Sequence, residues 1–380
     1  MLEVGVPDGE PVMRILFTGY APVHFLCFRP LYERLMARSG VDVSLSGGTR
    51  TKSPYAVDGY LYDHEDMYGR FRLPEGAVLP IASLNGAEYD VLFSANTRRI
   101  EPRRVGTRIQ IFHGMSFRNR AIRPETEGAD FYFLLGPYMR RGFERAGLLS
   151  PGDPRAVEIG FPKTDPLLDG SLDRAEMLAR HGISGDRPVV LYAPTGEHHN
   201  SLETMGEELI SRLAAVDRYD LLVKPHDHPH ADIDWWSRLA PLESEHVRVV
   251  REPDVIRTLS ITDLLLTDAS SVANEFALLD RPIVFIDVPE LLELTLRKGA
   301  LLDLETWGRK GGVVVPDVPT AIEAVEAGLT STDGRSPIRR ALVDDLFFNP
   351  GTATSAAMQW LEEELLPWDT ESDLMLLRSG

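Results

Sequence analysis

The sequence predicts an α/β protein with two parallel β-sheets, each covered by helices on both faces. Short apolar runs that end in polar or glycine-containing turns alternate with helical segments along most of the 380 residues. The runs 264–267 and 283–286 flank one such helical segment and are apolar enough for strands that are buried on both faces. Because a single hydrophobic core stops growing at about 250–300 residues, the length predicts two domains.

The first half contains a regular series of predicted elements and one long exception. The predicted elements, in chain order, are a strand at 14–19, a helix at about 24–38, and strands at 91–93, 109–112 and 131–135. The exception is segment 47–76, in which four tyrosines lie among polar residues and glycines. Its length predicts an irregular ligand-binding loop or lid.

Turn-forming residues at 150–154 and the segment Gly160–Asp165 mark the crossing into the second half, where the alternation of strand and helix resumes. We therefore expect a first domain at residues 1–165 and a second at 166–345. A C-terminal segment, 346–380, includes a helical stretch that is apolar on one face.

The segment 263–286 carries the strongest chemical signal. Ser270 and Ser271 stand where a helix must begin after a buried strand, so that their hydroxyls and the first-turn amides suit an anion such as phosphate. Glu275 follows one turn later, and carboxylates bind ribose hydroxyls in dinucleotide folds. The alternative is a well-capped helix of the kind found in many α/β proteins.

A second polar segment follows the predicted strand at 221–223. Lys224, His226 and His228 would lie at the carboxyl end of that strand, where open α/β sheets bind ligands. Imidazoles there can donate to phosphate oxygens or move protons near neutral pH. Two other interpretations remain open, a metal site and solvated histidines without a function.

A third segment ends the predicted strand at 109–112 with His113-Gly114. The glycine permits a sharp turn that leaves His113 projecting at the strand end, as a general base in a cleft would. The neighbouring Ser116 and Arg118 are polar and cationic, which suits an anionic substrate. The alternative is a core histidine bonded to a backbone carbonyl.

Composition restricts the classes of partner. A net charge of −18 argues against nucleic acid or anionic lipid as a general electrostatic partner, so we expect at most peripheral membrane contact. No apolar run approaches the ~18 residues of a membrane span, and we expect a cytoplasmic protein. The single cysteine, Cys27, lies in an apolar stretch and is predicted to be a small buried residue. No Asp-x-Asp pair stands beside a strand end, so neither a metal nor another cofactor is expected.

Five motifs occur in an order that resembles a known family. They are His113-Gly114, Gly160-Phe-Pro-Lys-Thr-Asp165, Leu191-Tyr-Ala-Pro-Thr195, Lys224-Pro-His226 and Thr267-Asp-Ala-Ser-Ser271. In this order they resemble the CDP-glycerol glycerophosphotransferases, which include the teichoic-acid primases and polymerases. That resemblance implies a GT-B fold, in which two Rossmann-like domains face a central cleft and a final helix packs back toward the first domain.

The resemblance also implies an activity, the transfer of glycerol phosphate or a related polyol phosphate from a CDP-activated donor to a hydroxyl acceptor. The resemblance implies that His113 is the general base and that His226 binds the donor phosphate. The further expected contacts are, for the donor diphosphate, Ser270, Ser271, Lys224 and Thr195; for the ribose and nucleotide, Glu275, Asp268 and Pro194; and for the acceptor, Gly114, Ser116 and Arg118.

Departures from the family pattern leave the acceptor open. After Pro194-Thr195 the chain continues Gly196-Glu-His-His-Asn200, where the family usually has an aromatic residue and an arginine. The acceptor could be a glycan, a polyol phosphate or a small molecule, and the sequence does not set the oligomeric state. Alternative functions are a glycosyltransferase that uses a CMP- or UDP-linked sugar and a non-catalytic nucleotide-binding relative. A sugar-nucleotide 2-epimerase shares the architecture, but the carboxylates expected in its first domain are not apparent.

Overall fold

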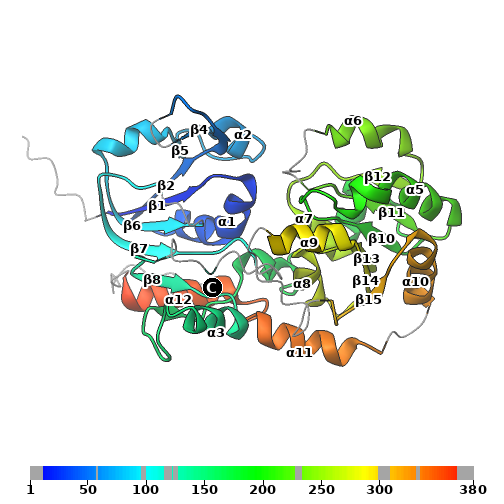
Figure 1. The fold of residues 1–380 in the computed structure, drawn as a ribbon. Helices are drawn as coiled ribbons and strands as arrows, with labels where there is room; N and C mark the ends of the chain where they lie inside the picture. Colours follow the sequence, from blue (N-terminus) through cyan, green and yellow to red (C-terminus); the bar gives the residue numbers. More distant parts are fainter. Residues whose placement is uncertain are drawn as a thin grey trace, which may run out of the picture.

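The computed structural model describes residues 12–56, 59–95, 100–114, 122, 127–226, 233–297, 309–330 and 334–365. Ser116, Arg118 and His228, which the sequence singles out, lie outside them. The molecule has two halves side by side, each built around its own sheet (Figure 1).

The first half contains a sheet of parallel strands. Its strands are β1 (Met13–Gly19), β2 (Val41–Gly47), β5 (Val78–Leu79), β6 (Glu88–Ser94), β7 (Arg104–Gln110), β8 (Phe131–Phe133) and β9 (Ala156–Val157), and its helices are α1 (Pro22–Met36), α2 (His64–Tyr68) and α3 (Pro137–Arg145). The strand order is β5-β2-β1-β6-β7-β8-β9. Ile15, Leu16 and Phe17 of β1 are fully buried, as expected for a central parallel strand with both faces covered.

The second half repeats this plan. Its strands are β10 (Val189–Tyr192), β11 (Asp220–Val223), β12 (Val247–Val249), β13 (Leu264–Thr267), β14 (Ile283–Ile286) and β15 (Val313–Val315). Its helices are α4 (Arg174–Arg180), α5 (Ser201–Val216), α6 (Trp235–Leu239), α7 (Val255–Ile261), α8 (Val272–Ala277), α9 (Pro289–Arg297), α10 (Val318–Thr330) and α11 (Ser336–Leu346). The strand order is β12-β11-β10-β13-β14-β15, and every neighbouring pair is parallel.

Both sheets reverse their strand order beside the central strand, at β1/β6 in the first half and at β10/β13 in the second. Ligands of open α/β sheets bind outside the carboxyl ends of the strands at such points. The predicted α/β class with parallel sheets is confirmed, and this topology directs the segments after β10, β11 and β13 toward one region.

The prediction of an irregular segment at 47–76 was wrong for much of its length. Strands β3 (Thr49–Lys52) and β4 (Tyr60–Asp63) pair antiparallel, and α2 follows at once. Asp63 begins that helix, since its Oδ1 accepts a hydrogen bond from the Asp66 amide at 3.0 Å. The hairpin is exposed or half-buried, so its strands lack the apolar runs by which the other strands are recognised.

A short 3₁₀ helix, η3 (Pro162–Leu167), leads from the first half to the second. Its Asp165 carboxylate accepts hydrogen bonds from the amides of Ala353 at 3.0 Å and Thr354 at 2.7 Å. These amides open α12 (Ala353–Glu364), the last helix of the described residues, and would otherwise lack partners within that helix. Asp165 thereby joins the crossing segment to α12.

Helix α12 lies along the first half (Figure 1) and contributes to its core. Ala357 and Leu361 are buried in the same hydrophobic cluster as β1 and α1. The Trp360 ring packs edge-on against Phe131 and Phe133, with centroids 4.7 and 5.2 Å apart. The limits 1–165, 166–345 and 346–380 themselves stay a prediction.

Candidate functional site

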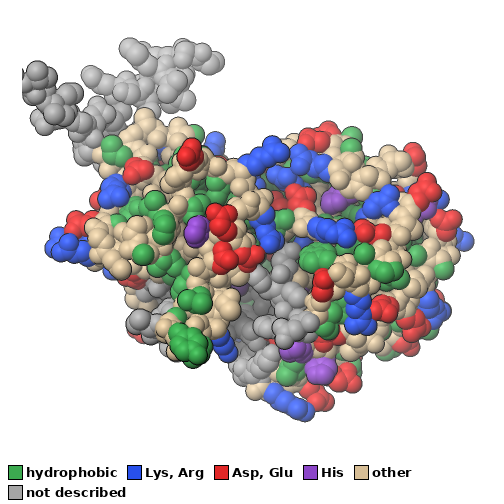
Figure 2. All heavy atoms as spheres, turned by 90° about the horizontal axis from the view of Figure 1, so that it is seen from above, with side chains coloured by type: hydrophobic (Ala, Val, Ile, Leu, Met, Phe, Trp, Pro, Cys, Tyr) green, Lys and Arg blue, Asp and Glu red, His purple; other side chains and the backbone are tan. Residues whose placement is uncertain are grey.

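A cavity of about 430 Å³ lies where segments that follow strand ends of the two halves meet. Eight of the residues singled out from the sequence line it: His113, Gly114, Pro194, Lys224, His226, Ser270, Ser271 and Glu275. Thr195 and Asp268 do not line it. Seen from above, Lys and Arg side chains lie along the boundary between the halves, with Asp and Glu side chains beside them (Figure 2).

Two strand ends form the wall on the side of the second half. Lys224 and His226 follow β11, and Ser270 and Ser271 follow β13. Lys224 is 6% exposed, whereas His226 is exposed. On this wall a lysine and an imidazole after β11 and two hydroxyls after β13 provide donors suited to phosphate oxygens.

The two serines differ in their relation to α8. Ser270 Oγ accepts a long hydrogen bond, 3.4 Å, from the Val272 amide. Ser271 occupies the residue before the helix but its side chain makes no capping bond. The expected cap is therefore confined to Ser270, because Ser271 has helical backbone angles, φ −66° and ψ −18°, where a capping residue is normally extended.

A buried ion pair also lines the cavity. Lys163 Nζ, from η3, lies 3.1 and 2.9 Å from the two carboxylate oxygens of Glu275, and both side chains are 6% exposed. Burial lowers the pKa of the Lys163 ammonium, but the opposing effect of nearby negative charge, chiefly Glu275, leaves the pKa above its ordinary value. Lys163 thus stays charged and fixes the carboxylate of Glu275, which was expected from the sequence to contact the ribose.

Asp268, which the sequence placed on the nucleotide side, supports the loop after β10. Its Oδ1 accepts from the amides of Thr195 and Ala269, and its Oδ2 from the amide and hydroxyl of Ser201. Burial raises the pKa of this carboxyl, and the four hydrogen bonds oppose the rise. With 1% exposure and both oxygens engaged, Asp268 positions the segment that carries Pro194 and Thr195.

Two histidines form the wall on the side of the first half. His113 is exposed after β7, and its ring lies 4.9 Å from the ring of His24 on α1, centroid to centroid. His24 is 2% exposed, and its Nδ1 accepts a hydrogen bond from the Tyr20 amide at 3.1 Å. A neutral His24 must therefore carry its proton on Nε2. Gly114 has φ +136°, which only glycine adopts readily, and it turns the chain beside the cavity a few residues after β7 ends at Gln110.

Residues 91–355, more than half of the chain, match the family model described as CDP-Glycerol:Poly(glycerophosphate) glycerophosphotransferase. The chain belongs to this family. It is 29% identical over 173 residues to the teichoic acid glycerol-phosphate primase of Bacillus spizizenii, covering 43% of this chain and 40% of the relative. It is 24% identical over 289 residues to the teichoic acid poly(glycerol phosphate) polymerase of Staphylococcus epidermidis, covering 64% and 39%. The matched regions thus span about two fifths of these relatives.

Solved structures support the fold. A structure of the wall teichoic acid polymerase TagF superposes with a TM-score of 0.66 at 15% identity, covering 93% of this chain and 89% of the other. A UDP-GlcNAc 2-epimerase from Neisseria meningitidis, bound to UDP-GlcNAc, gives a TM-score of 0.53 at 13% identity, covering 92% and 99%. Together with the two parallel sheets these matches confirm the expected GT-B architecture.

Four polar residues at the cavity were not among the site residues assigned from the sequence: Lys163, Glu197, Tyr20 and His24. Lys163 lies within one of the five motifs, yet no role follows from its position in the sequence. Glu197 is 1% exposed and belongs to the segment that departs from the family pattern. Tyr20 lies between β1 and α1, and His24 lies in the otherwise apolar stretch Pro22–Phe28 that begins α1. A histidine within that apolar stretch was the available signal.

Among the described residues no group of three or more His, Cys, Asp or Glu side chains could hold a metal ion. His228 and His230, which prompted the metal alternative, lie outside them. In the same part of the chain, no helix is long and apolar enough to cross a membrane.

Proposed function

We propose that the protein transfers glycerol phosphate from a CDP-linked donor to a hydroxyl group of an acceptor. The observation that carries the proposal is the shared cavity, which is lined by His113 of the first half and by Lys224, His226 and Ser271 of the second. Family membership supports the choice of donor. A solved structure of a TagF variant with CDPG agrees with that choice.

The proposed reaction joins the acceptor hydroxyl oxygen to the phosphorus that bears the glycerol. The bond from this phosphorus to the oxygen that bridges the two phosphates breaks, CMP leaves with that oxygen, and the hydroxyl proton passes to His113. A neutral imidazole near pH 7 accepts such a proton without a large pKa shift. Because little covalent chemistry falls to the protein, positioning and charge stabilisation supply most of the rate.

The second half is assigned to the donor. We place the diphosphate between His226 and Lys224 on one side and Ser270 and Ser271 on the other. Glu275 has lone pairs left after its pairing with Lys163, since a carboxylate offers about four acceptor positions, and we assign these to the ribose. Pro194 borders the nucleotide, while Thr195 and Asp268 act through the loop that they hold.

The first half is assigned to the acceptor, with Gly114 at the turn beside His113. His24 is a positioning residue in this scheme, because its buried ring packs against His113 and is itself fixed by the Tyr20 amide. The neighbours Ser116 and Arg118 remain proposed acceptor contacts from the sequence.

The similar fold of UDP-GlcNAc 2-epimerases makes a UDP-linked sugar the alternative donor. The lining of the cavity disfavours epimerase chemistry. Its carboxylates among the described residues, Glu197 and Glu275, both come from the second half, whereas the first half contributes histidines.

The deciding experiment measures release of CMP from CDP-glycerol in the presence of a panel of hydroxyl acceptors, alongside UDP-GlcNAc and a CMP-linked sugar. We expect acceptor-dependent release of CMP and a product that is larger than the acceptor by one glycerol phosphate. His226→Ala serves as the matched control for release by a contaminant. Turnover of the UDP- or CMP-linked sugar without turnover of CDP-glycerol would overturn the proposal.

A further inference from the structure

The turn at Gly114 brings the first half close to the second half beside the cavity. A methyl group on the Gly114 Cα would lie 4.0 Å from Ser271 Oγ and 4.0 Å from Glu275 Oε1. Ser271 immediately precedes α8, Glu275 lies in the first turn of that helix, and all three residues line the cavity. A side chain at position 114 would therefore point at the two oxygens that we assign to the diphosphate and the ribose.

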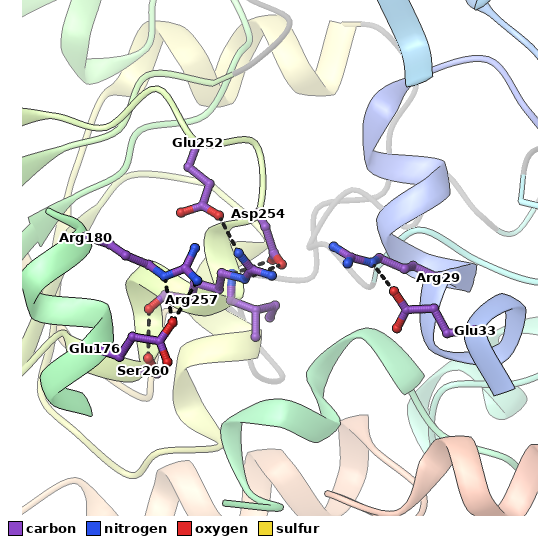
Figure 3. Close-up of polar contacts among 9 residues, drawn as sticks. Arg29, Glu33, Glu176, Arg180, Glu252, Asp254, Arg257 and Ser260 are labelled. Atoms are coloured by element: carbon purple, nitrogen blue, oxygen red, sulfur yellow. Dashed lines mark hydrogen bonds and ion pairs between the residues drawn. The ribbon is translucent and has the colours of Figure 1, made fainter. Parts of the chain in front are cut away.

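The charged side chains farther along α1 and α7 pair within their own half (Figure 3). Arg29 of α1 donates a hydrogen bond to Glu33 at 2.7 Å, and Arg257 of α7 donates one to Glu252 at 3.1 Å. The approach of the two halves at Gly114 is of a different kind. It joins a turn without a side chain to two polar groups of the cavity.

Two other glycines show the distances that a purely structural requirement produces. A methyl group at Gly136 or at Gly160 would lie 2.0 Å from a backbone carbonyl oxygen, so that no side chain fits there. At Gly114 the two distances of 4.0 Å are ordinary van der Waals separations, and the protein itself has room for a methyl group. What that methyl group would fill is cavity space beside the two oxygens.

We propose that Gly114 selects the sugar of the donor nucleotide, because it leaves room for a ribose hydroxyl that bonds to Glu275. The inference rests on the proposed function for the nucleotide and on the distances at Gly114 for the space. A hydroxyl that donates to Glu275 Oε1 lies about 2.5–3.0 Å from that oxygen, and hence beside the place of the missing side chain. Gly114 thus borders the donor as well as lying beside His113, and both halves contribute to the donor site.

The competing explanation is that position 114 needs glycine only for its backbone angle. The Gly114→Ala variant adds a methyl group and also strains the turn, since φ is +136°. Strain weakens every ligand alike, whereas the methyl group acts on the ligand atoms next to it. Gly76→Ala is the matched control in the first half. Its φ of +79° also disfavours alanine, and no atom of the described residues lies within 4 Å of the added methyl group.

The experiment measures, by calorimetry, the binding of CDP and of analogues in which the 2′ or the 3′ hydroxyl is replaced by hydrogen or by O-methyl. Neither replacement can donate a hydrogen bond to Glu275, so the two analogues at one ribose position differ mainly in size. In the parent protein both should bind more weakly than CDP and within about threefold of each other, because the space beside Gly114 accepts the extra methyl group.

In Gly114→Ala the added methyl group should occupy that space. At one of the two ribose positions, we expect the O-methyl analogue to bind about tenfold or more weakly than the deoxy analogue. The advantage of CDP over the deoxy analogue should fall by a similar factor. Each of these affinity ratios in Gly76→Ala should match the ratio in the parent protein.

Equal affinity ratios in Gly114→Ala and the parent protein, at both ribose positions, overturn the inference and leave the backbone angle as the reason for the glycine. A parent protein that binds the deoxy analogues but neither O-methyl analogue also overturns it, and this measurement stands even if Gly114→Ala does not fold. Failure of the parent protein to bind CDP contradicts the proposed function instead, and the same series is then measured with UDP. A parent protein that binds neither nucleotide overturns the inference as well.

Discussion

Lys163 and Glu275, 112 residues apart in sequence, form a buried ion pair with a shortest N–O distance of 2.9 Å. The pair connects the crossing segment η3 to α8, the helix that carries the proposed nucleotide contacts. A single buried charge lowers the free energy of unfolding far more than the intact pair does, because no partner charge then compensates for its loss of solvation.

Removing either partner alone should therefore destabilise the protein. We expect Lys163→Met or Glu275→Gln to lower the free energy of unfolding by about 3–5 kcal/mol, at the upper end when the carboxylate stays unpaired. Urea denaturation measures this loss. The double variant should recover much of it, and a double variant whose loss equals the sum of the single losses would show that the two side chains do not interact.

Ser271→Ala should separate binding from stability. Since the Ser271 hydroxyl makes no capping bond, its removal should leave the thermal midpoint unchanged. Loss of a hydrogen bond to the diphosphate should weaken CDP roughly three- to tenfold by calorimetry. Ser270→Ala is the matched control, and it should also lower stability slightly. Unchanged CDP affinity in both variants would place the diphosphate elsewhere.

His113 and His226 should differ in their kinetic signatures. His113→Ala should lower kcat about 10²- to 10⁴-fold with little change in donor affinity, because a base acts mainly in the transition state. His226→Ala should weaken donor binding as well as turnover. Steady-state kinetics with both substrates varied measures each effect, and near-parental kcat in His113→Ala would remove the assignment of the base.

Turnover should survive chelation. The donor wall supplies Lys224, His226 and the two serines to neutralise the leaving nucleotide, so no bound cation is needed for charge balance. The measurement is the rate of CMP release before and after treatment with EDTA. Activity that disappears and returns with Mg²⁺ or Mn²⁺ would contradict this prediction.

Cys27 should be inert and should make stability pH-dependent. Burial raises the pKa of its thiol to about 12 from the ordinary 9.0. At about pH 8 only roughly one thiol in ten thousand is ionised, so iodoacetamide should modify the unfolded chain but not the native protein, as read by mass spectrometry. Since the unfolded thiol ionises first, stability should fall as the pH rises from 9.0 toward 12. The Cys27→Ala variant should lose less stability than the parent protein over this pH range. An equal loss of stability in both proteins would contradict the prediction.

The sequence predicted the strands of the cores well, because parallel strands buried on both faces are continuous apolar runs. The segment 264–267 matches β13 residue for residue. The sequence also predicted that most residues of the proposed site lie close together, because side chains that follow neighbouring parallel strands lie at the same edge of the sheet. It missed the β3–β4 hairpin, whose exposed strands carry no apolar pattern, and the partner of Glu275. No local pattern encodes an ion pair that forms only when η3 meets α8.

The position of α12 has a consequence for biosynthesis. The core of the first half includes Ala357, Leu361 and the ring of Trp360, which the ribosome adds after both sheets have been made. The second sheet and its helices can form while the first half still lacks this cover. Emerging chains would then expose Phe131 and Phe133 to solvent and to chaperones until α12 leaves the exit tunnel. The half that is synthesised first is thus the half completed last.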